Sequence, residues 1–286
     1  MKPIEENDLT LRIREDADAV EQALSVRWLA DVGTHAPLLG EAMRWAVLGG
    51  GKRVRAFLCL EIARILAPGT DALDYACALE LLHASSLVHD DMPEMDNDDI
   101  RRGKPSCHKQ FGPAIALMAG DALIALAFRA AAGDADRAAE AVSVLSEAGG
   151  WQGIASGQTL DLLSEGRRIS LEELKTLQRL KTGRLIVAAA ELGALAARAS
   201  AEKTRDFAAY AEAIGQAFQV TDDLLDAGES GSDRARDLAT FLRFMTPEEA
   251  LAYAAKLTEK GKDAIRKYPG TELLLSFADR LLARTC

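Results

Sequence analysis

Two clusters of aspartate residues are the side chains of this chain that are best suited to chemistry. Their members are Asp90, Asp91 and Asp96 in the first cluster and Asp222, Asp223 and Asp226 in the second. Clustered carboxylates repel one another unless a cation neutralises them. Mg²⁺ prefers oxygen ligands and commonly combines one or two carboxylates with the phosphates of a substrate. If the clusters face each other, they would clamp a diphosphate through Mg²⁺; a solvated acidic surface is the alternative for either cluster alone.

The residues around the first cluster predict how its carboxylates are presented. Asp90 ends an apolar stretch with helical periodicity. Pro93 follows three residues later, and proline cannot continue a helix because it lacks a backbone N–H. We expect the chain to turn there, which would let Asp96 swing back beside Asp90.

The second cluster lies within a long predicted helix. Asp222 and Asp226 are four residues apart and therefore share one helix face. Gln219 precedes Asp222 by three residues on the same face. Lys181 and Thr182 stand at a junction between predicted helices, from which an ammonium and a hydroxyl group could point into the molecule.

Two basic segments carry groups that would meet phosphates. Lys52 and Arg55 follow three glycines at the start of a predicted helix, where backbone N–H groups and cations together favour an anion. Arg101 and Arg102 come shortly after the first aspartate cluster and offer planar forks suited to phosphate oxygens. The alternatives are a solvated basic turn for the first segment and an internal salt-bridge network for the second.

His83 and His89 are the remaining candidates, and they lie on the same predicted helix. They are six residues apart, which places them about 240° apart around the helix axis. We therefore do not expect them to form a metal-binding pair. A core histidine with one satisfied hydrogen bond is the simplest interpretation of each.

Composition and charge restrict the possible partners. The chain has 34 basic and 44 acidic residues, a net charge of −10, which argues against a nucleic-acid partner. The four cysteines show no metal-ligand spacing and no paired framework, which indicates free thiols in a reducing cytoplasm. The N-terminus has no apolar signal core. The apolar run over residues 113–132 contains Asp121 and Arg129, so it predicts a buried helix rather than a membrane span.

The elements that must position these groups are all predicted to be helices. Almost every segment has helical periodicity, and none has the two-residue period of a strand. No linker or repeat marks a boundary in the 286 residues, so we expect a single all-α domain, a helical bundle over residues 1–286. A capping box at Ser170 and Glu173 starts one helix. The other predicted helices cover about residues 13–27, 37–48, 52–66, 71–91, 112–132, 136–148, 150–163, 203–227, 247–268 and 272–284.

From about Leu38 to Asp226 the chain resembles the short-chain trans-isoprenyl diphosphate synthases, a family that includes farnesyl and geranylgeranyl diphosphate synthases. Each matching motif alone is weak, whereas their joint order and spacing are very specific. The motifs are GGKRVR at 50–55, ELLH at 80–83, DDMPEMD at 90–96, RRGKP at 101–105, GDAL at 120–123, GQTLD at 157–161, KTG at 181–183 and FQVTDDLLD at 218–226.

The resemblance implies an all-α isoprenoid-synthase fold around a central active-site cavity, usually in a homodimer. It implies that isopentenyl diphosphate is bound by Lys52, Arg55, His83 and Arg102. It implies that the diphosphate of an allylic partner (dimethylallyl, geranyl or farnesyl diphosphate) is held by Arg101.

The resemblance also implies Mg²⁺ as the cofactor. The implied ligands are Asp90 and Asp96 from one side and Asp222 from the other, with Asp91, Asp223 and Asp226 as ligands or supports. The residues implied to line the place where an allylic cation forms are Lys181, Thr182 and Gln219. In the family the departing diphosphate is thought to take the proton, so no side-chain base is expected.

The sequence departs from the family pattern at two places. Ala56 stands where the family usually has proline. After the second cluster the family usually has two lysines, whereas residues 228–241 are shorter and contain none; Arg234 and Arg236 are the candidates to replace them. This departure leaves a weakly active regulatory subunit as an alternative. A class I terpene cyclase is a third interpretation, but it would have an Asn/Ser/Glu pattern in place of DDLLD.

The residue five before the first motif bears on product length. In the family this position is often aromatic when farnesyl diphosphate is the product. Here it is Ser85, flanked by Ala84 and Ser86. A small residue would leave a deeper cavity, so we expect geranylgeranyl diphosphate, with farnesyl diphosphate as the alternative. Small residues also let helices pack closely, which is the other explanation for this segment.

Overall fold

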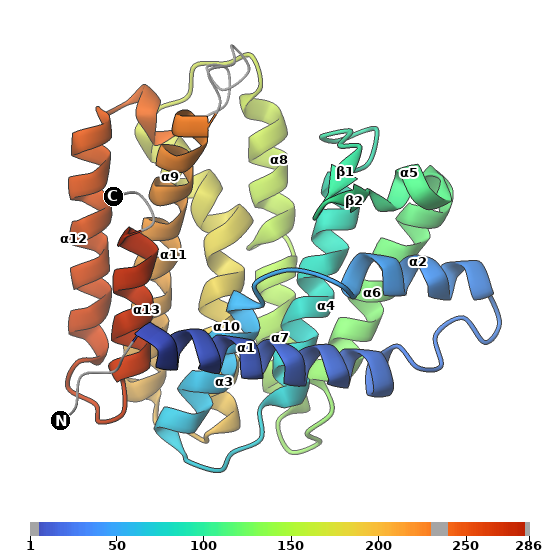
Figure 1. Ribbon diagram of the computed structural model, residues 1–286, viewed down its shortest axis with the longest axis horizontal. Coiled ribbons are helices and arrows are strands. Elements are labelled where there is room, and N and C mark those ends of the chain that lie inside the picture. The colour runs from blue at the N-terminus through green and yellow to red at the C-terminus, as the bar shows by residue number, and fades with distance from the viewer. Residues whose placement is uncertain (1–5, 230–239, 284–286) are drawn as a thin grey trace.

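The computed structural model describes residues 6–229 and 240–283, and it confirms the predicted all-α class (Figure 1). Its α-helices are α1 Glu6–Ala23, α2 Pro37–Val47, α3 Val54–Leu66, α4 Leu73–Asp90, α5 Cys107–Phe111, α6 Pro113–Ala131, α7 Ala138–Gly149, α8 Ile154–Ser164, α9 Leu171–Gln178, α10 Arg184–Ala196, α11 Ala201–Glu229, α12 Pro247–Ile265 and α13 Glu272–Ala283. Shorter elements are the π-helical turns η1 Leu24–Trp28 and η2 Arg179–Gly183, the 3₁₀ turn η4 Phe241–Arg243, and the strands β1 Ile100–Arg101 and β2 Lys104–Pro105. Arg234 and Arg236 lie outside the described residues.

The predicted capping box is present at the start of α9. The Ser170 hydroxyl accepts a hydrogen bond from the Glu173 backbone N–H at 3.2 Å, and the Glu173 carboxylate accepts one from the Ser170 backbone N–H at 2.7 Å. Each bond satisfies a backbone N–H that has no partner within the helix. Helix α9 leads directly into η2, so this cap fixes where the turn that carries Lys181 and Thr182 begins.

The helix predicted over residues 52–66 begins at Val54, two residues later than expected. Arg53 precedes it with a φ of 48°, outside the helical region. The guanidinium group of Arg53 is buried and donates hydrogen bonds to Glu80 at 3.0 Å and to the Val47 carbonyl at 2.6 Å. Arg53 is therefore held inside the molecule, where it fixes the loop that carries Lys52.

The expectation that no strand occurs was wrong for one short hairpin, formed by β1 and β2. Ile100 pairs with Pro105 in an antiparallel register, and the two-residue turn between the strands is formed by Arg102 and Gly103. These turn residues have φ values of 54° and 75°. Positive φ at both positions matches the twist of a tight hairpin. Two-residue strands are too short to show a period of two in the sequence.

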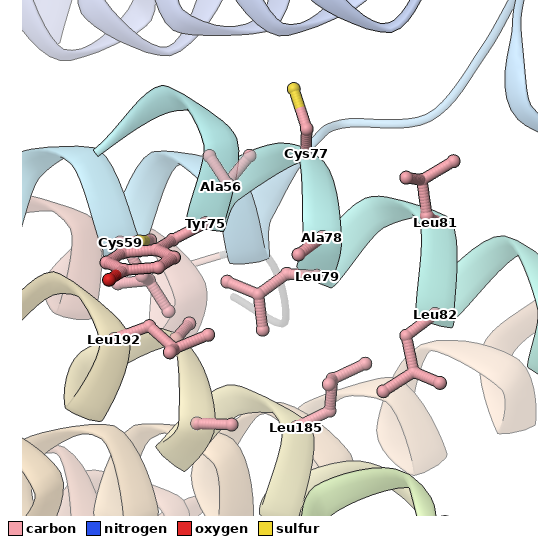
Figure 2. Packing of buried hydrophobic residues seen from close by; sticks show 14 of the residues in the cluster. Ala56, Cys59, Tyr75, Cys77, Ala78, Leu79, Leu81, Leu82, Leu185 and Leu192 are labelled. Carbon is pink, nitrogen blue, oxygen red and sulfur yellow. The ribbon is translucent and has the colours of Figure 1, made fainter. Parts of the chain in front are cut away.

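The largest core cluster brings α3, α4 and α10 together. Figure 2 shows buried side chains of these three helices, among them Leu79 and Leu82 of α4 and Leu185 and Leu192 of α10, gathered in the interior. Burying such side chains supplies most of the favourable free energy of folding. Helix α4, which carries the first aspartate cluster, is thus fixed along its length.

Helix α6 packs along α4. Its residues Ala116, Ala119, Leu123 and Ala127 are fully buried, as the prediction of a core helix requires. Among the helices that the structure describes, α6 alone has the length and hydropathy of a membrane span, and 44 % of that stretch is buried inside the protein. Length and composition alone are weak indications of a membrane span.

The two helices that carry the aspartate clusters end on the same side of the bundle. Both α4 and α11 run toward the upper end of Figure 1, where α4 is followed by the β1–β2 hairpin. Helix α1 crosses the lower part of the view. The bundle therefore places both clusters toward one end.

Candidate active site

The first aspartate cluster forms where α4 ends. The backbone turns after Asp90, and the Asp96 N–H donates a hydrogen bond to the Asp90 carbonyl at 2.9 Å. Asn97 follows with a φ of 49° and donates to the Met92 carbonyl at 3.0 Å. Asp96 is thus folded back toward Asp90, as the turn at Pro93 predicted.

The carboxylates of this cluster are not fully compensated by the protein. Burial raises the pKa of Asp90 to about 6; Lys181 opposes this shift, and Asp96 and Asp91 add to it. Burial also raises the pKa of Asp96. Because burial disfavours the charged form of these carboxylates, a nearby cation would stabilise that form.

Mg²⁺ fits these donors when a substrate supplies further oxygens. Within residues 6–229 and 240–283, no three His, Cys, Asp or Glu side chains gather closely enough to hold a metal ion by themselves. Mg²⁺ typically binds to one or two carboxylates together with substrate phosphates and waters. The oxygen pair offered by Asp90 and Asp96 matches that requirement.

Asp91 points toward the hairpin and not simply into the cluster. Its buried carboxylate accepts hydrogen bonds from Nε and Nη2 of Arg101, the Nε bond measuring 2.9 Å to Oδ1. Arg101 also donates to Asp98 at 3.1 Å. The predicted roles of Asp91 at the metal and of Arg101 at the allylic diphosphate stay predictions.

The predicted basic residues line one cavity of about 810 Å³. Those facing it include Lys52, Arg55, His83, Arg101 and Arg102. The Nε atom of Arg55 is buried without a hydrogen-bond partner. Burial lowers the pKa of Arg55, Glu80 opposes the shift, and the charge of Arg102 adds to it. Positive charge is therefore concentrated here in a partly desolvated space that suits an anion.

His83 belongs to the same cavity and is held neutral by it. Burial lowers the pKa of His83 well below its usual value, and the charges of Arg55 and Arg102 lower it further. A neutral imidazole can donate one hydrogen bond to a phosphate without adding to the repulsion between the arginines.

The glycine pair that precedes Lys52 makes room for Arg102. A β-carbon placed on Gly51 would lie 3.2 Å from the guanidinium carbon of Arg102, and Gly51 has a φ of 100°. A β-carbon on Gly50 would lie 3.1 Å from Cδ of Arg102. The loop and the hairpin can meet at this distance because neither glycine has a side chain.

Helix α4 relates the cavity to the aspartate cluster. His83 and Asp90 are seven residues apart, which places them on one helix face about 10 Å apart along the axis. His89 faces elsewhere: its Nε2 atom is 3.6 Å from Asp121 of α6 and would clash with a β-carbon on Gly120. The two histidines are thus separated as predicted.

The turn η2 links the two aspartate clusters. Nζ of Lys181 lies 2.5 Å from Oδ2 of Asp161, and its charge also acts on Asp90 and Asp96. The Thr182 hydroxyl donates to the Gln219 side-chain oxygen at 3.4 Å. Lys181 therefore faces the first cluster, while Thr182 contacts α11 one turn before Asp222.

The members of the second cluster differ in their surroundings. Asp222 is half-buried and Asp226 is exposed. Asp223 accepts a hydrogen bond from the Phe241 backbone N–H at 2.7 Å. Burial raises the pKa of Asp223 to about 6, the Phe241 N–H opposes this shift, and Asp226 and Asp222 add to it.

Sequence reasoning did not select three residues that hold this site together. They are Asp161, which binds Lys181; Glu80, which binds Arg53; and Lys104, whose ammonium donates to the carbonyls of Trp45 and Leu48 at 2.6 and 3.1 Å. Each belongs to a motif quoted for the resemblance, GQTLD, ELLH or RRGKP. That membership was the available signal, but it does not reveal which side chain each one contacts.

Comparison with known proteins decides the family. The sequence model of the polyprenyl synthetase family matches residues 36–242. The chain belongs to the polyprenyl synthetase family. It is accordingly an enzyme, a trans-prenyltransferase of isoprenoid biosynthesis, as the motifs predicted.

Curated relatives of this polyprenyl synthetase include enzymes with two different products. Farnesyl diphosphate synthase of Haemophilus influenzae (strain ATCC 51907 / DSM 11121 / KW20 / Rd) is 40 % identical over 265 residues, covering 87 % of this chain and 90 % of the relative. Geranylgeranyl pyrophosphate synthase 7 of Arabidopsis thaliana is 36 % identical over 296 residues, covering 97 % of this chain and 84 % of the relative.

Solved structures agree with this assignment. An FPP/GFPP synthase from Zymomonas mobilis superposes with a TM-score of 0.87 at 34 % sequence identity, covering 96 % of this chain and 99 % of that one. The predicted isoprenoid-synthase fold is therefore confirmed.

Proposed function

We propose that this prenyltransferase condenses isopentenyl diphosphate with allylic diphosphates. The observation that carries the proposal is the arrangement of two kinds of site along one face of α4. A cavity lined by Arg55, His83 and Arg102 suits the diphosphate of one substrate. About 10 Å away along the helix, Asp90 and Asp96 offer the oxygen donors that a second, metal-bound diphosphate needs.

In this proposal the chain's own residues divide the work. Lys52, Arg55, His83 and Arg102 hold isopentenyl diphosphate, and Arg101 binds the allylic diphosphate. Lys181, Thr182 and Gln219 line the region between the clusters, where their dipoles and charge orient the reacting carbons. Residues that exclude water also protect an allylic cation, which would otherwise be quenched to an alcohol.

The proposed cofactor is Mg²⁺, held by Asp90 at the end of α4, by Asp96 from the turn that follows and by Asp222 from α11, with Asp91 and Asp226 as supports. When bound, it would supply Lewis-acid activation of the departing diphosphate. The raised pKa values of Asp90 and Asp96 mean that burial disfavours their charged forms, and a bound cation would stabilise those forms.

We propose a twenty-carbon product, geranylgeranyl diphosphate, with farnesyl diphosphate as the second candidate. Ser85 is buried and small, which would leave room for a longer chain beside the first cluster. The curated relatives include both product classes, so they do not favour one over the other.

We also propose that the enzyme is a cytoplasmic homodimer. Leu117 and Met118 on α6 and Trp151 after α7 are large apolar side chains that are exposed by 47 %, 52 % and 77 %. A second copy covering them would remove this apolar surface from water. Light scattering of the purified chain at several concentrations tests this, and a monomer at all concentrations would contradict it.

Product analysis tests the function. The purified chain would be incubated with Mg²⁺, labelled isopentenyl diphosphate and dimethylallyl, geranyl or farnesyl diphosphate in separate reactions. We expect twenty-carbon product with each primer and none in excess chelator. A fifteen-carbon end product would overturn only the chain length. No elongation of any primer would overturn the reaction and favour the alternative of a regulatory subunit.

A further inference from the structure

Asp223 is the member of the second cluster whose carboxylate is already bound to the protein backbone. Its Oδ2 atom accepts a hydrogen bond from the Phe241 backbone N–H at 2.7 Å. The buried Gln178 side chain, at the end of α9, interacts with the same carboxylate and opposes the rise of its pKa. Groups from two different elements, η4 and α9, thus face one side chain of α11.

Phe241 is fixed by more than this bond. Its side chain is only 2 % exposed and belongs to a separate small core with Leu174 of α9, Val220 of α11 and Ala250 of α12. The centroid of its ring also lies 5.9 Å from the ring centroid of Tyr253. The Asp223–Phe241 bond therefore joins α11 to a packed layer that includes α9 and α12.

Gln178 places this second interaction next to the proposed site. It is the last residue of α9, and η2 with Lys181 and Thr182 follows directly. On the other side, Asp223 is adjacent to Asp222 and one turn beyond Gln219. The Gln178–Asp223 interaction consequently lies between η2 and the segment of α11 that carries the second cluster.

We propose that Asp223 is a positioning residue that holds α11 against η4, and that it is not a ligand of the divalent cation. Successive residues of an α-helix point about 100° apart, so Asp222 and Asp223 cannot both face the same point at equal distance. The proposal rests on the proposed function only in naming the cation site from which Asp223 is excluded.

The replacement of Asp223 by asparagine separates the two roles. The asparagine side-chain oxygen can still accept from the Phe241 N–H, and the Gln178 amide can reorient to accept from the new NH₂ group. A positioning role predicts that Asp223→Asn keeps most of kcat, with a half-saturating Mg²⁺ concentration within about threefold of wild type. Asp90→Asn is the matched control, because it removes the charge of a proposed ligand and should raise that concentration about tenfold or more.

A second measurement does not depend on activity. In chelator and without substrate, Asp223→Ala should lower the unfolding temperature by on the order of 5 °C, because it leaves the Phe241 N–H without its partner in a buried position. Asp223→Asn should recover most of that loss. Asp90→Asn should not lower the unfolding temperature, because it removes a buried charge.

Two results would overturn the proposal. One is an Asp223→Asn enzyme whose half-saturating Mg²⁺ concentration rises as much as that of Asp90→Asn. The other is an Asp223→Ala protein that unfolds at the wild-type temperature in chelator. If the wild-type chain had no prenyltransferase activity, the proposed function would fail, while the unfolding measurements would still decide whether Asp223 holds these elements together.

Discussion

The ammonium group of Lys181 lies 2.5 Å from a carboxylate oxygen of Asp161. Burial by itself would lower the pKa of Lys181, but Asp161 opposes it, with Asp90 and Asp96 adding to the effect, and the pKa is raised. Lys181 is therefore held charged, with a fixed direction, beside the first aspartate cluster. This contact joins α8 to η2, two elements that the sequence alone does not bring together.

Asp161→Asn should lower kcat about tenfold while the protein still folds. Asparagine keeps the size of the side chain but removes the charge that holds the Lys181 ammonium in place, and a charge-assisted hydrogen bond contributes roughly 1.5–3 kcal/mol. Steady-state kinetics with both diphosphates would measure the effect. Thr159→Ala, a change on the exposed side of the same helix, is the control. An unchanged kcat in Asp161→Asn would show that the position of Lys181 does not matter for turnover.

His83 should make the stability of the substrate-free protein depend on pH in mildly acid solution. Burial lowers the pKa of His83 in the folded state, so between that value and about 6.5 the unfolded chain binds the extra proton. Stability from this residue is therefore complete above about pH 6.5 and is lost as the pH falls. One proton changes the free energy of unfolding by at most about 1.4 kcal/mol per pH unit.

Urea unfolding of wild type and His83→Gln from pH 7.5 to pH 5 would measure this dependence. The loss of stability toward low pH should be smaller in His83→Gln. His35→Gln, at an exposed position, should behave as wild type. Parallel pH curves for wild type and His83→Gln would mean that His83 is not held neutral by the cavity.

Arg102→Ala and Arg101→Ala should have separable effects. The Arg102 side chain lies against Gly50 and Gly51 and lines the basic cavity. Its loss should therefore raise the KM for isopentenyl diphosphate about 10- to 100-fold. Arg101 is bonded to Asp91 and Asp98, so its loss should mainly affect the allylic diphosphate and turnover. Initial rates with each substrate varied in turn give both constants. Equal changes in both constants for the two variants would contradict the assigned roles.

Ser85→Phe should shorten the main product from twenty carbons to fifteen. Ser85 is 2 % exposed and its hydroxyl donates to the Leu82 carbonyl of its own helix at 2.7 Å, so a ring there must displace whatever occupies the neighbouring space. A packed interior does not yield easily to added volume. Extraction and chromatography of the products would give the chain-length distribution.

The alternative for Ser85 is a packing role between helices. His89, one turn later on the same face of α4, lies against Gly120 of α6. If Ser85 serves only this packing, Ser85→Phe should lower the unfolding temperature and leave the product ratio unchanged. Measuring both quantities on the same preparation separates the two outcomes.

The sequence by itself determined the helical class, the turn that folds Asp96 back to Asp90, and the family. These features depend on local properties, since periodicity, proline and capping residues act within a few positions. The motifs also selected most of the charged groups that line the basic cavity. The hairpin was not predicted, because strands of two residues show no periodicity and its turn depends on positive φ values at Arg102 and Gly103.

Only the tertiary structure decided which partner each charged side chain has. Arg53 and Arg55 are two residues apart in one motif and both line the basic cavity, yet Arg53 is paired with Glu80 whereas the Nε atom of Arg55 has no hydrogen-bond partner. Asp222 and Asp223 are adjacent, yet Asp223 binds Phe241, 18 residues further along the chain. Such pairings arise when distant helices pack together and burial makes an unpaired charge or N–H costly, a condition that no local pattern of residues records.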